Sequence, residues 1–130
     1  MFHSFYDADK YKRILKTCQL KKDLKLFENG DLTIIGEKGM SLSGGQRARI
    51  GLARALYEDA DILLLDDPLG AVDADVKKKI LSSLLEIKNK TIVLVTHSVE
   101  VLDKVDRIIV FEKGSIIEND SFQNLSSRES

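Results

Sequence analysis

The stretch SLSGGQRARIGLARALYEDADILLLDDP, residues 41–68, carries the pattern that decides the fold. Near its end, Ile62–Leu65 is a short apolar run that is followed by two carboxylates and by the only proline of the chain. An apolar run bounded in this way predicts a strand that is buried on both faces of a parallel sheet. We therefore expect an α/β domain with this strand in its core.

The residues before this strand predict a half-buried helix over Gln46–Tyr57. Ile50, Ala53, Leu56 and Tyr57 recur at helical spacing, so they are expected on one apolar face. The wetter sides of the helix are expected to carry its arginines: Arg47, Arg49 and Arg54.

The remaining sequence predicts elements that alternate between strand and helix, which favours parallel βαβ pairing. We expect one or two helices in Ala8–Leu26, a loop over Phe27–Gly39 with a short strand at Leu32–Ile35, a helix over Ala74–Ile87, a strand over Thr91–Thr96, a short helix over Ser98–Lys104 capped by Ser98, a hairpin of Arg107–Glu112 and Ser115–Glu118, and a frayed end at residues 126–130.

Composition limits the classes of function. With 130 residues, 43% hydrophobic and 32% charged, the chain suits one domain or a piece of one. A formal net charge of −1 gives no basic excess for nucleic acid or an anionic membrane surface. Cys18 is the only cysteine, so neither an internal disulfide nor a zinc pattern is available. The apolar runs fall far short of the ~20 residues that span a bilayer.

Polar residues follow both predicted core strands, where ligands of parallel sheets bind. Asp66 and Asp67 follow the first strand, and His97 follows the second. Asp66 is placed to hold Mg²⁺, which prefers oxygen ligands, and Asp67 to orient an attacking water. Taken alone, a solvated turn explains the two aspartates equally well, and a lone histidine is more often a surface residue.

Ser43, Gly44 and Gly45 precede the predicted helix directly. Glycine amides allow close approach of an anion, and the positive end of the helix dipole favours phosphate there. A glycine turn that simply begins a helix is the more common explanation for such a triplet when it stands alone.

The order of these motifs changes that balance, because it resembles the ATP-binding cassette (ABC) ATPases. The matching segments are the signature motif (Leu42, Ser43, Gly44, Gly45 and Gln46), the Walker B strand (Ile62–Asp66), the D-loop (Gly70–Asp73) and the switch histidine (His97). Residues 35–74 most resemble the first nucleotide-binding domain of multidrug-resistance-associated exporters of the C subfamily.

The resemblance implies a partial P-loop NTPase fold, with a helical signature region over residues 1–57 and a part running from Walker B to a C-terminal hairpin and helix over 58–130. It implies that Ser43 and Gly45 contact the γ-phosphate of an ATP held mainly by a partner domain. By the same resemblance, Asp66 binds Mg²⁺ through water, Asp67 and His97 are catalytic, and Asp73 lies between two domains. The implied partners are a second nucleotide-binding domain with an intact P-loop and transmembrane domains, at the cytoplasmic face of a membrane, with no nucleic acid.

The sequence departs from the family at several positions. Asp67 replaces the usual glutamate and is one methylene shorter, so slow hydrolysis is expected. Gly70 replaces the usual D-loop serine, and Asp120 replaces a common glycine; both are interpreted as minor. A P-loop, GxxxxGK[ST], does not occur in the 130 residues, nor do the adenine-stacking aromatic and the Q-loop glutamine.

The absent motifs predict a fragment that begins inside the helical region and does not bind ATP alone. Its core strands are expected to be incompletely covered, so the isolated chain should be marginally stable or should associate. An alternative is a non-catalytic interaction module that donates its signature motif in trans. A third reading, the distal lobe of an SMC-like DNA-repair ATPase, requires a coiled coil before the signature, and no heptad run is present.

Overall fold

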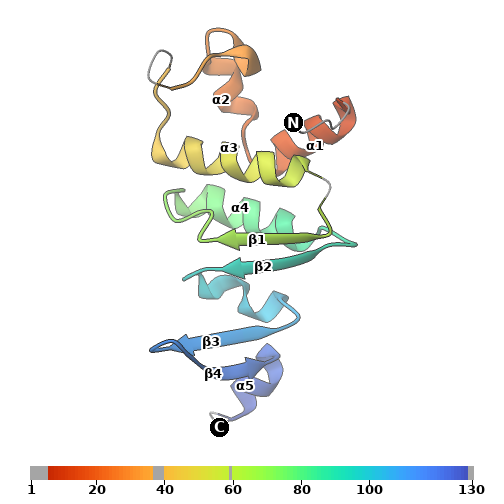
Figure 1. Cartoon of the computed structure of the whole chain (residues 1–130), viewed down its shortest axis with the longest axis vertical. Coiled ribbons are helices and arrows are strands. Elements are labelled where there is room, and N and C mark those ends of the chain that lie inside the picture. Colours follow the sequence, from red (N-terminus) through yellow and green to blue (C-terminus); the bar gives the residue numbers. More distant parts are fainter. Residues whose placement is uncertain (1–5, 37–39, 59, 129–130) are drawn as a thin grey trace. The chain divides into compact units, whose positions relative to one another are not determined.

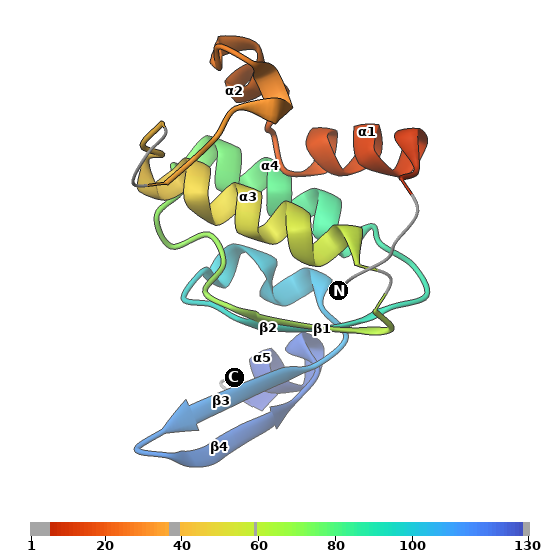
Figure 2. The same ribbon diagram turned by 45° about the horizontal axis from the view of Figure 1, so that its top comes forward.

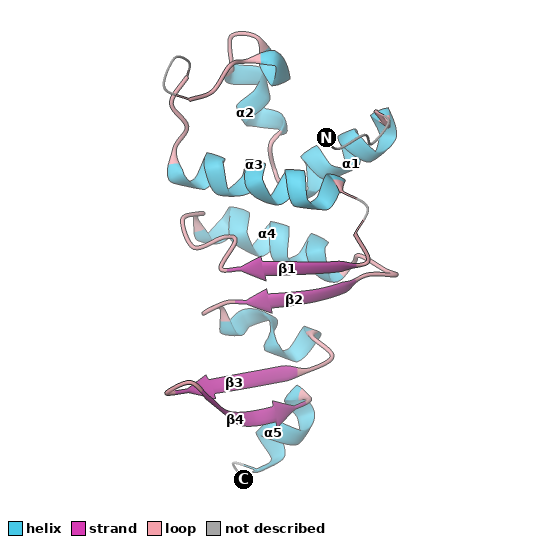
Figure 3. Cartoon of the chain, in the orientation of Figure 1, coloured by secondary structure: helices cyan, strands magenta, loops and turns pink. Residues whose placement is uncertain are grey.

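The computed structural model describes residues 6–36, 40–58 and 60–128. The chain divides into two compact units, residues 1–96 and 97–130. Figure 1 labels the elements of both units, and Figure 3 separates helices from strands by colour. Residues 37–39 of the expected loop and residues 129–130 of the expected frayed end lie outside the described residues.

The N-terminal unit is a helical layer followed by a βαβ unit. Its elements are α1 (Ala8–Thr17), α2 (Lys21–Leu26), the 3₁₀ helix η1 (Gly30–Leu32), α3 (Gly44–Tyr57), β1 (Ile62–Asp66), α4 (Ala74–Leu85) and β2 (Thr91–Val95). Strands β1 and β2 pair in parallel with Ile62 opposite Thr91, as the alternation of strand and helix predicts. Figures 1 and 2 show α3 and α4 on the same side of this sheet.

Burial of β1 corrects one expectation. Leu63 and Leu65 are buried, but Ile62 is 60% and Leu64 is 76% exposed, so the strand alternates rather than being buried on both faces. On β2, Val93 and Val95 are also exposed. The apolar run makes both faces of β1 apolar, but the helices of this unit lie on only one side of the sheet and cover only one of these faces. The incompletely covered strands that the sequence predicts are therefore confirmed.

Helix α3 is packed more extensively than its sequence pattern indicates. The expected face is half-buried, with Leu56 buried at its end. Leu52, which lies one turn before Leu56 on the same face, is only 3% exposed. Helix α4 contributes Ile80, which is as fully buried as Cys18, together with the buried Leu81 and Leu84. The buried face of α3 therefore extends to Leu52, beyond the residues that the sequence pattern identifies.

The segment between α2 and α3 corrects a second expectation. Instead of a strand at Leu32–Ile35, the chain forms η1 and then an isolated bridge between Ile35 and Met40. Gly30 begins η1 with a positive φ of 55°. Asn29 donates its backbone N–H to the Thr33 hydroxyl at 3.1 Å. Local hydrogen bonds of this kind compete with strand formation.

The C-terminal unit contains η2 (Val99–Lys104), β3 (Ile108–Glu112), β4 (Ser115–Asp120) and α5 (Phe122–Arg128). Strands β3 and β4 form the expected antiparallel hairpin, with a bulge between Val110 and Phe111. Lys113 and Gly114 both have positive φ, as a tight two-residue turn requires. Ser98 occupies the N-cap position of η2, but its side chain makes no capping hydrogen bond there.

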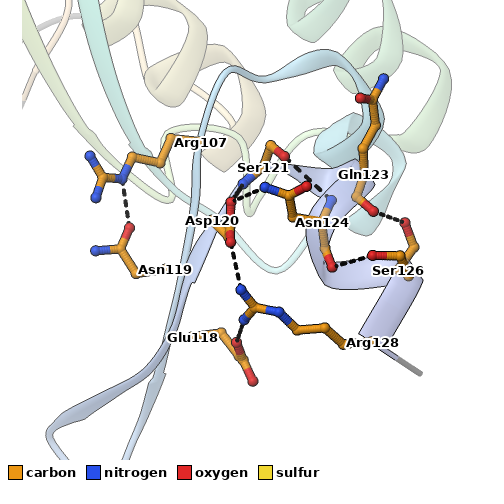
Figure 4. Close-up of polar contacts among 10 residues, drawn as sticks. Arg107, Glu118, Asn119, Asp120, Ser121, Gln123, Asn124, Ser126 and Arg128 are labelled. Carbon is orange, nitrogen blue, oxygen red and sulfur yellow. Dashed lines mark hydrogen bonds and ion pairs between the residues drawn. The ribbon is translucent and has the colours of Figure 1, made fainter. Parts of the chain in front are cut away.

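Helix α5 shows that the expected frayed end is wrong for residues 126–128. Asp120 holds this helix against β4: its Oδ1 accepts from the Asn124 amide at 2.7 Å and its Oδ2 from Arg128 at 2.7 Å. Arg128 also pairs with Glu118, as Figure 4 shows. Hydrogen bonds from Asn124 and the Ser121 N–H, with the charge of Arg128, lower the pKa of the Asp120 carboxyl. The aspartate at position 120 thus makes side-chain contacts with α5 that the common glycine could not make.

Candidate nucleotide-contacting site

The signature motif forms the beginning of α3. Ser43 is the N-cap residue, and its Oγ accepts a hydrogen bond from the Gln46 N–H at 3.1 Å. The Gln46 Oε1 accepts one from the Ser43 N–H at 2.9 Å, which completes a capping box. Leu42, which precedes the cap, is half-buried, and Ser43 is exposed. The motif therefore presents its serine at the positive end of a 14-residue helix.

The two signature glycines lie against the loop that follows β1. A Cβ added to Gly45 would lie 3.0 Å from the Ala71 carbonyl oxygen, and one added to Gly44 would lie 3.3 Å from the Ala71 Cβ. The sequence predicts glycines here for the approach of an anion. The structure adds a second reason, because the glycines allow the chain's own D-loop to pack closely on the helix.

Asp66 and Asp67 lie at the carboxyl end of β1 and are both exposed. The Asp67 N–H donates to the Val95 carbonyl at 2.9 Å and so extends the pairing with β2. Its φ of 38° lies in the left-handed region, which aspartate tolerates better than most residues. The Asp67 carboxylate lies over Gly70, where an added Cβ would be 2.5 Å from Oδ2. The departures at positions 67 and 70 are therefore in contact with each other.

Asp73 is the N-cap residue of α4. Its Oδ1 accepts from the Val76 N–H at 3.1 Å, and its carbonyl accepts from Lys77 at 2.8 Å. The sequence predicts a helix from Ala74, and the family resemblance implies only a place between domains for Asp73. An aspartate directly before a predicted helix is a signal that identifies such a cap.

His97 and the two aspartates at the end of β1 belong to different units of the chain. His97 is exposed and is the first residue of the C-terminal unit. Asp66 and Asp67 belong to the N-terminal unit. Among the residues that the structure describes, no three or more His, Cys, Asp or Glu side chains gather as a metal site. One or two carboxylates fit Mg²⁺ when waters and substrate phosphates complete its coordination.

A polar cluster that no sequence motif predicts joins α2 to α3. Asp23 on α2 binds Arg49 with an N–O distance of 2.6 Å, and their side chains are only 14% and 12% exposed. The expectation that Arg49 lies on a wetter side of its helix is therefore wrong. The Gln46 amide also donates to Asp23 Oδ1 at 3.0 Å. Contacts between residues so far apart in sequence leave no short motif by which they could be found.

Electrostatics in the same cluster favour the ionised form of Asp23. Burial by itself raises the pKa of this carboxyl. The hydrogen bonds from Arg49 and Gln46 and the charge of Arg49 outweigh burial, so the pKa lies below its ordinary value. Asp23 is therefore a carboxylate over the physiological pH range.

Comparisons with known proteins identify the family. The model of the ABC transporter family matches residues 4–70, and the chain therefore belongs to that family. Within it, the chain is 50% identical over 130 residues to ABC transporter C family member 5 of Arabidopsis thaliana, a match that covers 96% of this chain and 8% of the relative.

Other relatives also belong to the C subfamily or bear a transporter name. The mouse (Mus musculus) ATP-binding cassette sub-family C member 2 is 46% identical, over 98% of this chain and 9% of that protein. Bile pigment transporter 1 of Saccharomyces cerevisiae is 47% identical, over 98% and 8%. The chain thus resembles a nucleotide-binding domain of the multidrug-resistance-associated type and spans about a tenth of the length of such relatives. Within its described residues, no helix is long and apolar enough to cross a membrane.

Proposed function

We propose that this chain is part of a nucleotide-binding domain of a C-subfamily ABC transporter, in which it supplies the signature half of a composite ATP site. ATP binding and hydrolysis at such a site would be coupled to transport across a membrane. The proposed partners are a second nucleotide-binding domain that carries a P-loop and the transmembrane domains of the transporter.

The observation that carries the proposal is the pre-formed end of α3. Ser43 is fixed by a reciprocal capping box, and Gly45 is packed against the D-loop at Ala71. Preorganised donors favour phosphate because little reorganisation is needed when the charge arrives. In this proposal the Ser43 hydroxyl and the N–H groups of the first turn contact the γ-phosphate of ATP bound to the partner.

The strand-end carboxylates have the roles that the family resemblance implies. Asp66 would hold Mg²⁺ through water, and the ion would supply charge stabilisation for the phosphates. Asp67 would orient the attacking water, and His97 would sense the γ-phosphate. The short Asp67 side chain lies over Gly70, which supports slow hydrolysis at this site because proton transfer needs close contact with the water.

A titration with a charge variant tests the proposal. The chain is added to a C-subfamily nucleotide-binding domain that has an intact P-loop, and association and ATPase rate are measured with ATP and with ADP. Ser43→Asp keeps an N-cap residue but adds a negative charge where the phosphate would bind. We expect ATP-dependent association by the wild type and its loss in Ser43→Asp.

Ser41→Asp is the matched control, because it adds the same charge at an exposed position just before the motif. It should retain the ATP-dependent association. Equal association with ATP and ADP by the wild type, or equal losses in both variants, would contradict the proposal. For the chain alone we expect no measurable ATP affinity, and micromolar binding in calorimetry would contradict that.

A further inference from the structure

The side-chain amide of Gln46 is held from both ends. Its Oε1 accepts from the Ser43 N–H at 2.9 Å, and its Nε2 donates to Asp23 Oδ1 at 3.0 Å. If this amide were rotated by half a turn it would satisfy neither partner, because its oxygen only accepts and its nitrogen only donates. The acceptor on Asp23 therefore selects the orientation in which Gln46 supports the Ser43 backbone.

Arg49 fixes the Asp23 carboxylate in turn. Its two terminal nitrogens donate to the two oxygens of Asp23 at 2.6 and 3.2 Å, which is the bidentate arrangement. The same side chain donates to the Gln19 carbonyl at 2.7 Å and to the Gly45 carbonyl at 3.3 Å. Arg49 thus links the end of α1, helix α2 and the first turn of α3.

We propose that Asp23 is the positioning residue of the signature motif: through Gln46 it orients Ser43, and through Arg49 it anchors the first turn at Gly45. Asp23 itself does not contact nucleotide. Its function as a positioning residue rests on the proposed role of the signature motif toward the γ-phosphate.

Asparagine is the informative substitution at position 23. It preserves size and can still accept from Gln46 through its one oxygen. Its NH₂ group, however, would face the cationic Arg49 side chain, which would lose one acceptor and its counter-charge. In either orientation of the new amide, Gln46 or one terminal nitrogen of Arg49 therefore loses its acceptor on residue 23.

Asp31→Asn provides the matched control within the same helical region. Asp31 accepts a hydrogen bond from the Tyr11 hydroxyl at 2.7 Å and belongs to η1 rather than to the Asp23–Gln46–Arg49 cluster, so it reports on general loss of helical stability. Asp23→Glu provides the conservative rescue, because it keeps both the charge and the paired acceptor oxygens.

The first measurement uses the full chain alone. Amide NMR of Asp23→Asn should shift the resonances of the Gln46 side chain and the Ser43 N–H, whereas Asp31→Asn should leave them in place. Unchanged Gln46 and Ser43 resonances in Asp23→Asn would overturn the inference. This readout is independent of ATP, so it distinguishes failure of the inference from failure of the proposed function.

The second measurement uses the full chain with the P-loop-bearing domain. Loss of a hydrogen bond to a charged group is expected to weaken the ATP-dependent association roughly tenfold in Asp23→Asn. Association with the ADP-bound domain should not change, and Asp23→Glu should recover part of the loss. An equal loss in Asp31→Asn would overturn the inference, because it would show that any destabilised helix has the same effect.

Discussion

Replacing Gly45 with alanine tests whether the close contact between the signature helix and the D-loop limits the residue at this position. The new Cβ would lie 3.0 Å from the backbone oxygen of Ala71, which cannot rotate away as a side chain can. Forcing an extra methyl into such a contact costs about 1–3 kcal/mol. The loop must shift, so the signature and the D-loop should be disturbed together.

The expected magnitude comes from comparison with Gly51→Ala in the same helix. A Cβ added to Gly51 has no neighbouring atom within 4 Å. Alanine should therefore stabilise the helix there by about 1 kcal/mol, the usual difference in helix propensity. At Gly45 a similar gain is opposed by the clash, so the free energies of unfolding of the two variants should differ by about 1–3 kcal/mol.

The assay is urea unfolding at equal protein concentration. An excluded osmolyte is added to favour burial, because we expect the isolated chain to be marginally stable. The urea midpoint of Gly51→Ala should be higher than that of the wild type, and the midpoint of Gly45→Ala should be lower than that of Gly51→Ala. The slope of the free energy of unfolding against urea should be equal in both variants. Gly44→Ala, whose Cβ would lie 3.3 Å from the Ala71 side chain, should fall between the two. A Gly45→Ala protein as stable as Gly51→Ala would refute the reasoning.

Further outcomes follow from the packing and the charges. Asp73→Ala should lower the free energy of unfolding by about 1 kcal/mol through loss of the α4 cap, and Asp73→Asn should retain most of it in the same urea assay. Leu64→Lys, on the open face of β1, should reduce self-association in sedimentation, whereas Leu63→Ala should cost about 2–5 kcal/mol because that residue is 4% exposed. Asp120→Gly, which restores the common family residue, should speed amide exchange in α5. The lowered pKa of Asp23 stabilises the fold at any pH above the pKa of the unfolded state, about 3.9, and this stabilisation is lost as pH falls through the pKa of the folded state. Acid titration should therefore reduce the difference in free energy of unfolding between the wild type and Asp23→Asn.

Local sequence patterns predict most elements of this chain correctly. The parallel pair of β1 and β2, helix α4 between them and the hairpin with its Lys113-Gly114 turn are confirmed. These elements follow from short-range patterns, such as apolar runs, helical spacing and turn glycine. The family model confirms the family resemblance as well. This resemblance could be found from sequence because the signature and Walker B motifs are each a continuous segment.

The errors concern burial and partners. The short strand before α3 is replaced by a 3₁₀ helix, since local hydrogen bonds of Gly30 and Thr33 compete with extension. The outward face of β1 is exposed at Leu64 although the residue is apolar. Arg49 is enclosed although it is charged. The type of a residue indicates which contacts it can make, but it does not show which helices and strands pack against it.

The sequence alone therefore determines the order of motifs, the class of fold and the residue types available for phosphate and Mg²⁺, because each is encoded in neighbours along the chain. Only the tertiary structure shows that Gly45 packs against Ala71, that Asp67 covers Gly70, and that Asp23 reaches Gln46 and Arg49. These contacts join segments that are distant in sequence, and close packing and paired charges make them specific only after the chain has folded.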